Sequence, residues 1–463
     1  MSNPSSQRSA VVLAAGQGTR FKSRRIKILH ELCGKPMLLH ILDKLKALEV
    51  GRAVLVVASE AEEVRRTVED YAPPFDLQFA VQTKQLGTGH ALATAVPYLP
   101  DQGSVLVLYG DTPLISPRTL QRLFQAVEEE GADEALLTAI LDDPYGYGRI
   151  LRDPEGNPLG TVEEKDADEA QRKIREVNSG FYGFKASVLK PALSELDNDN
   201  AAGEYYLTDL LDILRSGGKR VRAVMAEDAS ETLGVNDRLQ LAHAEGLMRR
   251  QINRRWMREG VTMLDPSRVL IDAEVELARD VTLYPGVVLQ GGTRIAEEVE
   301  VRSNCHLVNA LVGRGTLLDQ GTVIRDSSVG EEARVGPYAH LRGGTQAGDR
   351  VRIGNFVEVK KSILEEDAKA AHLTYLGDSS IGRQANIGAG TITCNYDGKR
   401  KYRTVIGERA FIGSNSQLVA PVTIGAGAYV AAGSTITEDV PPGALAIARS
   451  RQVVKPDWTP EDD

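Results

Sequence analysis

Aliphatic residues recur at every sixth position along two stretches in the second half of the chain. The first stretch comprises Ile271, Leu277, Leu283, Leu289, Ile295, Val301 and Leu307, and the second comprises Ile406, Ile412, Leu418, Ile424, Val430 and Ile436. Helices and strands repeat at much shorter intervals, so neither produces a period of six. A hexapeptide solenoid does, because each six-residue unit forms one short face of a prismatic β-helix and points its aliphatic side chain inward. The spacing therefore predicts a parallel β-helix.

The six-residue register is disturbed between the two stretches. It slips at Val312 and again at Val329, and it is lost in the polar and basic segment CNYDGKRKYRT at 394–404. A segment of this composition suits a loop better than a face of a coil. We expect it to be pushed out of the β-helix.

The first half of the chain follows a different pattern. Two apolar runs, at 52–59 and 104–111, have the length and composition of buried strands. Residues 35–50 place leucines at helical spacing behind Pro36, and proline suits the first turn of a helix. Such alternation of strands and helices predicts a parallel α/β sheet with helices on both faces.

A stretch without proline at 237–260 carries leucines among many charges and predicts one long helix that links the two halves. The predicted fold class is therefore α/β followed by β. The predicted parts are a Rossmann-like α/β domain at 1–236, a linking helix at 237–260, a hexapeptide-repeat domain at 261–449 and a tail at 450–463.

Composition limits the classes of protein that the chain can belong to. With 463 residues, 42% of them hydrophobic and 26% charged, it is typical of a globular protein of two or three domains. It has no apolar run long enough for membrane insertion and no secretory h-region at its start, which predicts a cytoplasmic protein. The three cysteines are far apart without CxxC spacing, so neither a disulfide framework nor a zinc knuckle is indicated.

The segment VVLAAGQGTRFKSRRIK at 11–27 combines an apolar run, a turn of small residues and a cluster of positive charge. The turn has the exposed backbone N–H groups that cradle phosphate. Five of the eight residues from Arg20 to Lys27 are basic in a chain of net charge −9, which favours a polyanionic small ligand over nucleic acid. The glycine spacing matches neither the Walker A motif nor the dinucleotide fingerprint. An ordinary solvated turn remains the alternative.

Asp111 is the last residue of the second run and directly follows VLVLYG, where a carboxylate at the carboxyl edge of the sheet can hold Mg²⁺. A structural Asp-Thr-Pro turn is the alternative at this position. Three further polar stretches contain glycine beside groups that can bind a base, a sugar or a phosphate, and each could also be only a turn. They lie at 85–91, 146–150 and 177–180.

His372 lies in the segment AAHLTYLGD, inside the solenoid whose inward positions are otherwise aliphatic. Polar residues accompany it on neighbouring coils, namely Arg342, Glu358, Lys360, Tyr375 and Asn386. An imidazole oriented by a carboxylate is the arrangement of a general base. The alternative is a zinc site between subunits that uses His306, His340 and His372, and the absence of a close histidine pair makes it the weaker hypothesis.

From Val11 to about Arg449 the chain resembles the bifunctional bacterial N-acetylglucosamine-1-phosphate uridyltransferase/glucosamine-1-phosphate acetyltransferases. The segments that carry the resemblance are LAAGQGTR, QLGTGHA, YGDTPLI, GYGRI, NFVEVKK, HLTYLGD and NIGAGTITCNYDG. The resemblance implies a left-handed β-helix, a homotrimer and two reactions in sequence. The second half would acetylate glucosamine 1-phosphate with acetyl-coenzyme A, and the first half would transfer a uridylyl group from UTP to the product. The alternative is a single-activity pyrophosphorylase whose β-helix only assembles trimers.

The same resemblance implies roles for residues of the first half. Those that would bind UTP and its phosphates are Leu13, Ala14, Ala15, Gly16, Arg20, Lys27, Gln82, Gly87, Thr88 and Tyr109. Gly148, Glu163 and Asn178 would hold the N-acetylglucosamine moiety. Asp111 and Asn236 would share the Mg²⁺ ion.

In the second half the resemblance makes His372 the base and Glu358 its orienting group. The sugar phosphate would be bound by Arg342, Lys360, Tyr375 and Asn386. Acetyl-coenzyme A would be bound by Ala389, Asn395, Tyr396, Ser414, Ala432 and Arg449. The chain departs from the family where Ile26 replaces a proline before the lysine, and where Gly343 replaces the proline of an Arg-Pro-Gly segment.

Overall fold

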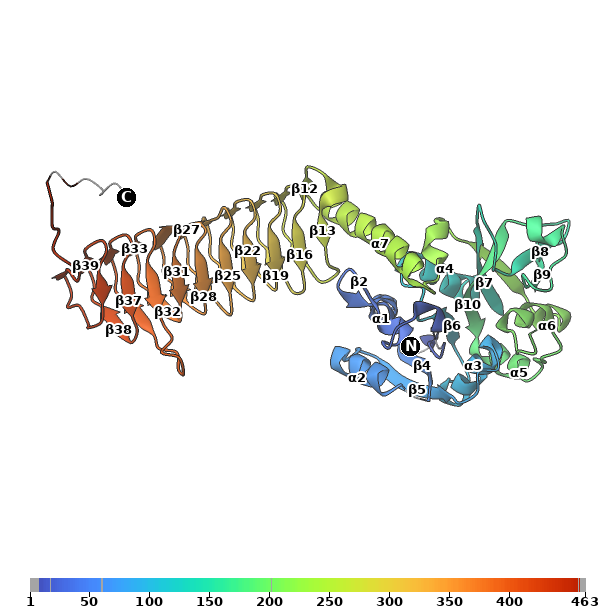
Figure 1. Ribbon diagram of the computed structural model, residues 1–463. Helices are drawn as coiled ribbons and strands as arrows, with labels where there is room; N and C mark the ends of the chain where they lie inside the picture. The colour runs from blue at the N-terminus through green and yellow to red at the C-terminus, as the bar shows by residue number, and fades with distance from the viewer. Residues whose placement is uncertain (1–7, 17, 60, 201, 457, 459–463) are drawn as a thin grey trace, which may run out of the picture. The chain divides into compact units, whose positions relative to one another are not determined.

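The computed structural model describes residues 8–16, 18–59, 61–200, 202–456 and 458. The chain forms two compact units, one up to Met248 and one from Arg249 (Figure 1). Helix α7, Arg238–Arg258, lies within the stretch in which one long helix is expected, and it crosses the boundary between the units. Among the described residues, none of the helices combines the length and the hydropathy needed to cross a membrane.

The first unit is built on one sheet in the order β11-β7-β10-β6-β1-β4-β5. Its strands are β1 Arg8–Leu13, β4 Arg52–Ala58, β5 Asp76–Gln82, β6 Ser104–Tyr109, β7 Glu134–Ile140, β10 Glu176–Lys185 and β11 Val221–Met225. Only β10 runs antiparallel to its neighbours in this path. Strands β8 Arg149–Arg152 and β9 Pro158–Val162 form an antiparallel pair that joins β10.

Helices cover both faces of this sheet, which explains why its central strands are apolar on both sides. One core packs α1 Met37–Ala47, α2 Glu62–Tyr71 and α4 Pro117–Glu128. The other packs α3 Thr88–Ala95, α5 Ala186–Leu193 and α6 Leu210–Ser216. The short elements are β2 Glu31–Leu32, β3 Lys35–Pro36, η2 Thr19–Phe21, η3 Lys27–Leu29, η4 Val96–Tyr98, η5 Gln171–Lys173, η6 Leu207–Asp209, η7 Ala229–Thr232 and η8 Pro266–Arg268, the last in the second unit.

The second unit has three parallel faces. The first face comprises β12 Thr262–Met263, β15 Thr282–Leu283, β18 Glu300–Val301, β21 Leu317–Leu318, β24 Arg334–Val335, β27 Arg352–Asn355, β30 Lys369–His372, β33 Asn386–Ile387, β36 Phe411–Ile412, β39 Tyr429–Val430 and β41 Leu445–Ala446. The second comprises β13 Leu270–Ile271, β16 Val288–Gln290, β19 His306–Val308, β22 Val323–Arg325, β25 His340–Arg342, β28 Glu358–Lys360, β31 Tyr375–Gly377, β34 Ile392–Cys394, β37 Gln417–Val419 and β40 Thr435–Ile436. The third comprises β14 Glu276–Leu277, β17 Arg294–Ile295, β20 Leu311–Val312, β23 Ser328–Val329, β26 Gln346–Ala347, β29 Ile363–Leu364, β32 Ser379–Ile381, β35 Thr404–Ile406 and β38 Val422–Ile424.

The six-residue period sets this architecture. Consecutive members of the first series lie on consecutive faces, and each pairs with the residue three units later, as Ile271 does with Leu289. All members of both series are buried and belong to one continuous core. The prediction of a hexapeptide β-helix is therefore confirmed. We call the turns from the first to the second face the first corner, and those from the second to the third face the second corner.

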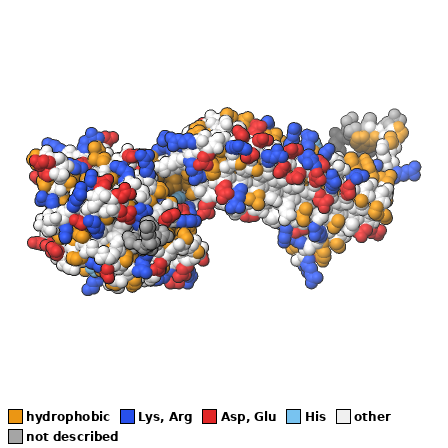
Figure 2. Space-filling model, turned by 180° about the vertical axis from the view of Figure 1, so that it is seen from behind, with side chains coloured by type: hydrophobic (Ala, Val, Ile, Leu, Met, Phe, Trp, Pro, Cys, Tyr) orange, Lys and Arg blue, Asp and Glu red, His pale blue; other side chains and the backbone are white. Residues whose placement is uncertain are grey.

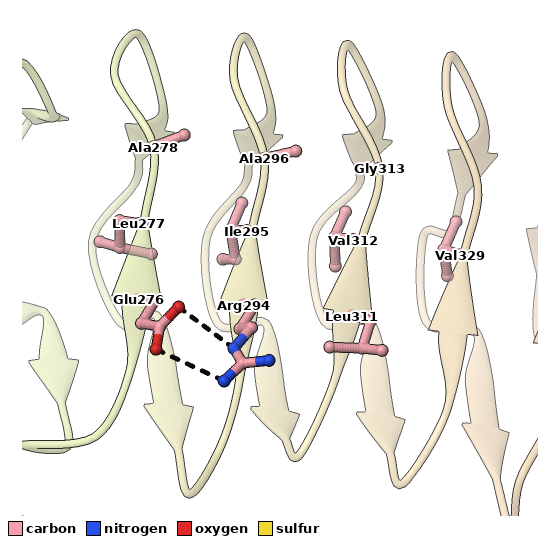
Figure 3. A pocket seen from close by; sticks show the side chains of 10 residues that line it. All are labelled: Glu276, Leu277, Ala278, Arg294, Ile295, Ala296, Leu311, Val312, Gly313 and Val329. Carbon is pink, nitrogen blue, oxygen red and sulfur yellow. Dashed lines mark hydrogen bonds and ion pairs between the residues drawn. The ribbon is translucent and has the colours of Figure 1, made fainter.

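Figure 3 shows one column of this core on the third face. Leu277, Ile295, Val312 and Val329 stack in register, although the step from 295 to 312 is one residue shorter than the step from 277 to 295. The column stays in register at the slip because the turn before it is shorter, with Asn309 in the left-handed region at φ 49°. The expected irregularity at Val312 thus lies in a turn and leaves the core column intact.

The expected loop leaves the coil between β34 and β35. Tyr396 and Lys401 form an antiparallel bridge, and the backbone N–H of Tyr402 donates to the carbonyl of Asn395 at 2.9 Å. The segment is therefore a short hairpin that projects from the β-helix (Figure 1). Figure 2 shows Lys and Arg side chains at the tip of this projection.

Glu134, the first residue of β7, is the most unusual buried charge in the first unit. Its side chain is fully buried, and neither carboxylate oxygen has a hydrogen-bond partner among the described residues. Burial, with a smaller contribution from Asp212, raises the pKa of this carboxyl from 4.5 to about 8. Between these two pH values the folded state holds a proton that the unfolded chain has released, so stability falls as pH rises through that range.

We expect Glu134→Gln to remove this pH dependence and to stabilise the first unit above pH 8, by on the order of 5 kcal/mol at most, because each pKa unit corresponds to about 1.4 kcal/mol. Urea unfolding followed by helical circular dichroism from pH 5 to 9 measures the effect, since α1 to α6 belong to the first unit. The exposed Glu129→Gln is the matched control. Parallel loss of stability in wild type and Glu134→Gln would contradict the assignment.

Candidate active sites

A cleft of about 320 Å³ opens at the carboxyl edge of the sheet in the first unit. It lies there because β1 and β6 are adjacent and end in register, with Leu13 opposite Tyr109. The predicted nucleotide and metal residues that line it are Leu13, Ala14, Ala15, Gly16, Lys27, Gln82, Gly87, Thr88, Tyr109 and Asp111. The lining also includes Ile28, Gln85, Ala91 and Glu204, to which the sequence analysis gave no individual role.

The predicted stretch at 85–91 is held in place by several polar contacts. The Gln82 amide donates to the carbonyl of Gly87 at 3.1 Å, and the Gln85 amide donates to the carbonyl of Ala15 at 2.9 Å. Gly87 has φ +105°, and a side chain there would lie 2.5 Å from the carbonyl oxygen of Tyr205. This glycine therefore allows the close approach that shapes one wall of the cleft.

One ammonium group joins the two residues expected to hold the metal. Nζ of Lys27 forms an ion pair with Oδ2 of Asp111 and donates to Oδ1 of Asn236 at 3.1 Å. Both oxygens therefore converge on one cationic centre. A carboxylate and an amide oxygen are ligands that suit Mg²⁺, a cation that usually takes its remaining ligands from phosphates and water. The residues present fit the ion.

The residues expected to hold the sugar also lie together. The backbone N–H of Asn178 donates to the carbonyl of Gly148 at 2.8 Å. A side chain on Gly148 would lie 3.3 Å from Oε1 of Glu163, and Thr208 donates to that same oxygen at 2.9 Å. Burial raises the pKa of the Glu163 carboxyl. Because Gly148 has no side chain, it leaves room beside the half-buried carboxylate of Glu163.

Tyr109 lies between the cleft and the residues that are expected to hold the sugar. Its ring lies against Gly180, where a side chain would come within 2.5 Å of Cε2. Burial, with the nearby carboxylates of Asp111 and Glu163 as lesser causes, raises the pKa of the Tyr109 hydroxyl. The phenol thus stays neutral between the two groups of residues.

Arg20 is the predicted residue that the structure leaves apart. It is exposed on η2 and is not among the residues that line the cleft, as far as the structure describes them. Its role in phosphate binding stays a prediction.

Three of the four predicted sugar-phosphate residues of the second unit lie on the second face. Arg342 pairs in register with Lys360, and Tyr375 pairs with Glu358. Lys360 lies 3.5 Å from Asp378, which also accepts from the Asn395 amide at 2.6 Å. Arg342 and Lys360 end their strands, so they lie at the second corner.

Lys401 is a further basic group at this corner that the sequence analysis did not single out. The ammonium of Lys360 lies within hydrogen-bonding reach, and this contact lowers the pKa of Lys401. Two ammonium groups placed side by side favour an anion between them. The basic composition of the loop at 394–404 was the available signal.

The group that holds His372 differs from the one expected. Nδ1 of His372 lies 2.7 Å from Oδ1 of Asn355, whereas Glu358 accepts two bonds from Arg342 at 2.8 and 2.6 Å. Within the described chain, Glu358 makes no contact with the imidazole. In one chain Glu358 lies on the second face and pairs with arginine, while His372 ends a strand of the first face, so the orienting role of Glu358 stays a prediction.

Predicted acetyl-coenzyme A residues continue from His372 along the first corner. Backbone N–H groups of the residues that follow Ser414 and Ala432 donate to the carbonyls of Ala389 and Ser414 at 2.7 and 2.8 Å. Nη1 of Arg449 donates to the carbonyl of Ala432 at 2.6 Å. Ala389, Ser414, Ala432 and Arg449 thus form one column.

The remaining predicted residues lie elsewhere. Asn386 is on the first face, between Lys369 and Phe411, and not with Arg342 and Lys360. Asn395 is buried at the base of the projecting hairpin, and Tyr396 beside it is exposed. One chain therefore divides the expected ligand contacts between faces that point in different directions.

The alternative zinc hypothesis concerns a site between subunits, and one chain holds its three histidines apart. His306 and His340 belong to second-face strands separated by β22, and His372 ends a first-face strand. In the described ranges no group of three potential metal ligands among His, Cys, Asp and Glu is found. A zinc site between subunits therefore stays the alternative hypothesis.

The two units match two different families. Residues 10–163 match the MobA-like NTP transferase domain, and residues 403–438 match the bacterial transferase hexapeptide, six repeats. The bifunctional protein GlmU of Geobacillus sp. (strain WCH70) is 48% identical over 98% of this chain and 97% of its own length. GlmU of Caldanaerobacter subterraneus subsp. tengcongensis is also 48% identical, over 98% of this chain and 97% of its own. GlmU of Shouchella clausii (strain KSM-K16) is 46% identical over 99% of this chain and 100% of its own.

These relatives cover both units together, so a β-helix that serves only for assembly does not describe the chain. Nucleotidyl transfer and acetyl transfer each have their own unit. The chain belongs to the GlmU family and is a bifunctional nucleotidyltransferase and acetyltransferase.

Proposed function

We propose that the cleft of the first unit transfers a uridylyl group from UTP to N-acetylglucosamine 1-phosphate, and that the corners of the β-helix acetylate glucosamine 1-phosphate with acetyl-coenzyme A. The observation that carries the first assignment is the convergence of Lys27, Asp111 and Asn236. The second rests on His372 at the head of the first-corner column. The cytoplasmic location stays a prediction from the sequence.

In uridylyl transfer, a phosphate oxygen of the sugar phosphate attacks the α-phosphorus of UTP, and the bond to the β-phosphate breaks to release pyrophosphate. Asp111 and Asn236 would hold Mg²⁺, which supplies charge neutralisation on the phosphate oxygens. Lys27, whose ammonium contacts both residues, would bind phosphate. Gln82, which is buried in the cleft wall, would bind the base.

In acetyl transfer, the amine of glucosamine 1-phosphate attacks the thioester carbonyl, and coenzyme A leaves as a thiolate that takes up a proton. His372 accepts the proton that the amine loses. Its imidazole is exposed and reaches solvent-borne substrates directly. The paired ammonium groups of Lys360 and Lys401 supply the positive charge that the sugar phosphate needs.

We propose that the acetyl site is shared within a homotrimer. Asn386 lies on the first face and Lys360 at the end of a second-face strand, so one phosphate contacts both only if they come from different chains. Hexapeptide β-helices present flat faces, and a groove between neighbouring prisms offers the concave site that one chain lacks.

Asp111→Ala is expected to lower uridylyl transfer by at least about 10²-fold, because the metal loses its carboxylate ligand. Acetyl transfer by the same preparation should be unchanged. Pyrophosphate release from UTP measures the first activity and free thiol measures the second. Asp101→Ala, which removes an exposed carboxylate paired with Lys190, is the control. Uridylyl transfer near the wild-type rate in Asp111→Ala would disprove the assignment.

Replacing His372 by alanine should reduce acetyl transfer by about 10²–10⁴-fold, as the loss of a general base typically does. Uridylyl transfer should persist, because His372 lies in the other unit. His306→Ala is the matched control, since His306 bonds to Gln290 on the second face. Free-thiol release at saturating acetyl-coenzyme A is the measurement, and an unchanged rate would rule out His372 as the base.

Sedimentation equilibrium of the full chain should give three times 50.2 kDa.

Co-expression of Lys360→Ala with Asn386→Asp tests the shared site. Random mixing restores both residues at about a quarter of the sites, so acetyl transfer should recover in the mixture although each variant alone is inactive. A monomer with full activity, or mixtures no more active than the separate variants, would refute the shared site.

A further inference from the structure

The strand pair that ends at His372 is longer than the others on the first face. β27 and β30 each have four residues, whereas the other first-face strands have two. The additional pairing places Asn355 opposite His372. On the first face, the paired strands are therefore longest at the position of the expected base.

Gly354 permits this extension. A side chain at Gly354 would overlap the carbonyl group of Ala371 on the facing strand. Residue 354 is buried, so the clash could not be relieved by moving into solvent. The close approach of β27 and β30 thus depends on glycine, and it fixes the distance between the side chains of the next pair.

Both the backbone and the side chain of Asn355 hold the segment that carries the imidazole. Its carbonyl accepts from the backbone N–H of Leu373 at 2.9 Å, and its Oδ1 lies 2.7 Å from Nδ1 of His372. Phe356 and Leu373 then turn the chain with φ of 55° and 44°. The imidazole is anchored at Nδ1, while Nε2 has no partner among the described residues.

We propose that Asn355 is a positioning residue for acetyl transfer, an inference that rests on the proposed role of His372. Oδ1 accepts a hydrogen bond from Nδ1–H, which leaves the lone pair on Nε2 facing the substrate. During the reaction Nε2 takes the proton from the amine, and Oδ1 keeps its bond to Nδ1 of the imidazolium. Asn355 itself neither gains nor loses a proton.

The charged groups around the pair are few. Arg352 and Lys369 belong to the same two strands, and Glu358 with Arg342 lies beyond the first corner. Glu358 and Arg342 form an ion pair with one another. The amide of Asn355 is the polar group in contact with the imidazole, so a change of its charge should be felt at His372 more than at any other titratable group.

The experiment compares Asn355→Ala, Asn355→Asp and Phe356→Ala by the pH dependence of kcat and KM for acetyl transfer. Asn355→Ala should lower kcat by about 10- to 100-fold with KM changed little, because the base is present but free to rotate. Asn355→Asp keeps an acceptor and adds a negative charge that stabilises imidazolium. It should restore most of kcat and move the acid limb of the profile about 0.5–1 pH unit higher.

Phe356→Ala changes the same turn without touching the imidazole, since Phe356 stacks on Tyr338. Its pH profile should match that of the wild type. A wild-type kcat in Asn355→Ala, or an acid limb in Asn355→Asp that does not move, would overturn the proposal. Activity in His372→Ala would instead overturn the proposed base, so the two failures are distinguishable. Uridylyl transfer and trimer mass, measured on the same samples, report whether each variant is folded.

Discussion

The buried aliphatic side chain at every sixth position is the constraint on which the β-helix and its active site depend. Because three units complete a coil, the residue two positions after the aliphatic position on one face lies next to its equivalents on the coils before and after it. The column of Ala389, Ser414 and Ala432 arises in this way. The core thus decides which exposed residues become neighbours, although none of them contributes to the core.

The first unit also brings residues that are far apart in sequence together, but it does so through the strands of its sheet. Parallel strands that end in register bring the turns after β1 and β6 to one edge, and Lys27 then bridges Asp111 and Asn236, residues far apart in sequence. An ammonium group between two oxygen ligands neutralises the carboxylate before any ligand is bound. The ammonium thus supplies positive charge where the two side-chain oxygens converge.

Much of the fold could be predicted because the six-residue period and the alternation of strands and helices depend on burial alone. The six-residue series, the irregularity at Val312 and the hairpin at 394–404 all follow from where aliphatic residues can point. The hydrogen-bond partner of His372 could be predicted only from the register of individual strands. Glu358 precedes His372 by 14 residues, less than one coil, which puts it on another face, whereas Asn355 precedes it by 17, the length of a shortened coil. Counting coils would have favoured Asn355.

Several of the residues proposed to act in the β-helix, such as His372, Ser414 and Ala432, are exposed at its corners, where a substitution costs the fold little. Exposed ion pairs such as that of Arg342 and Glu358 add little stability either. The residues at these positions can therefore be chosen for substrate binding and catalysis. Gly354 is the exception, because the strand approach that it permits also places Asn355 beside His372. At this one strand pair the requirements of the fold and of the reaction coincide. Loss of the glycine would thus disturb the imidazole through the backbone, while loss of the asparagine amide would disturb it through the side chain alone.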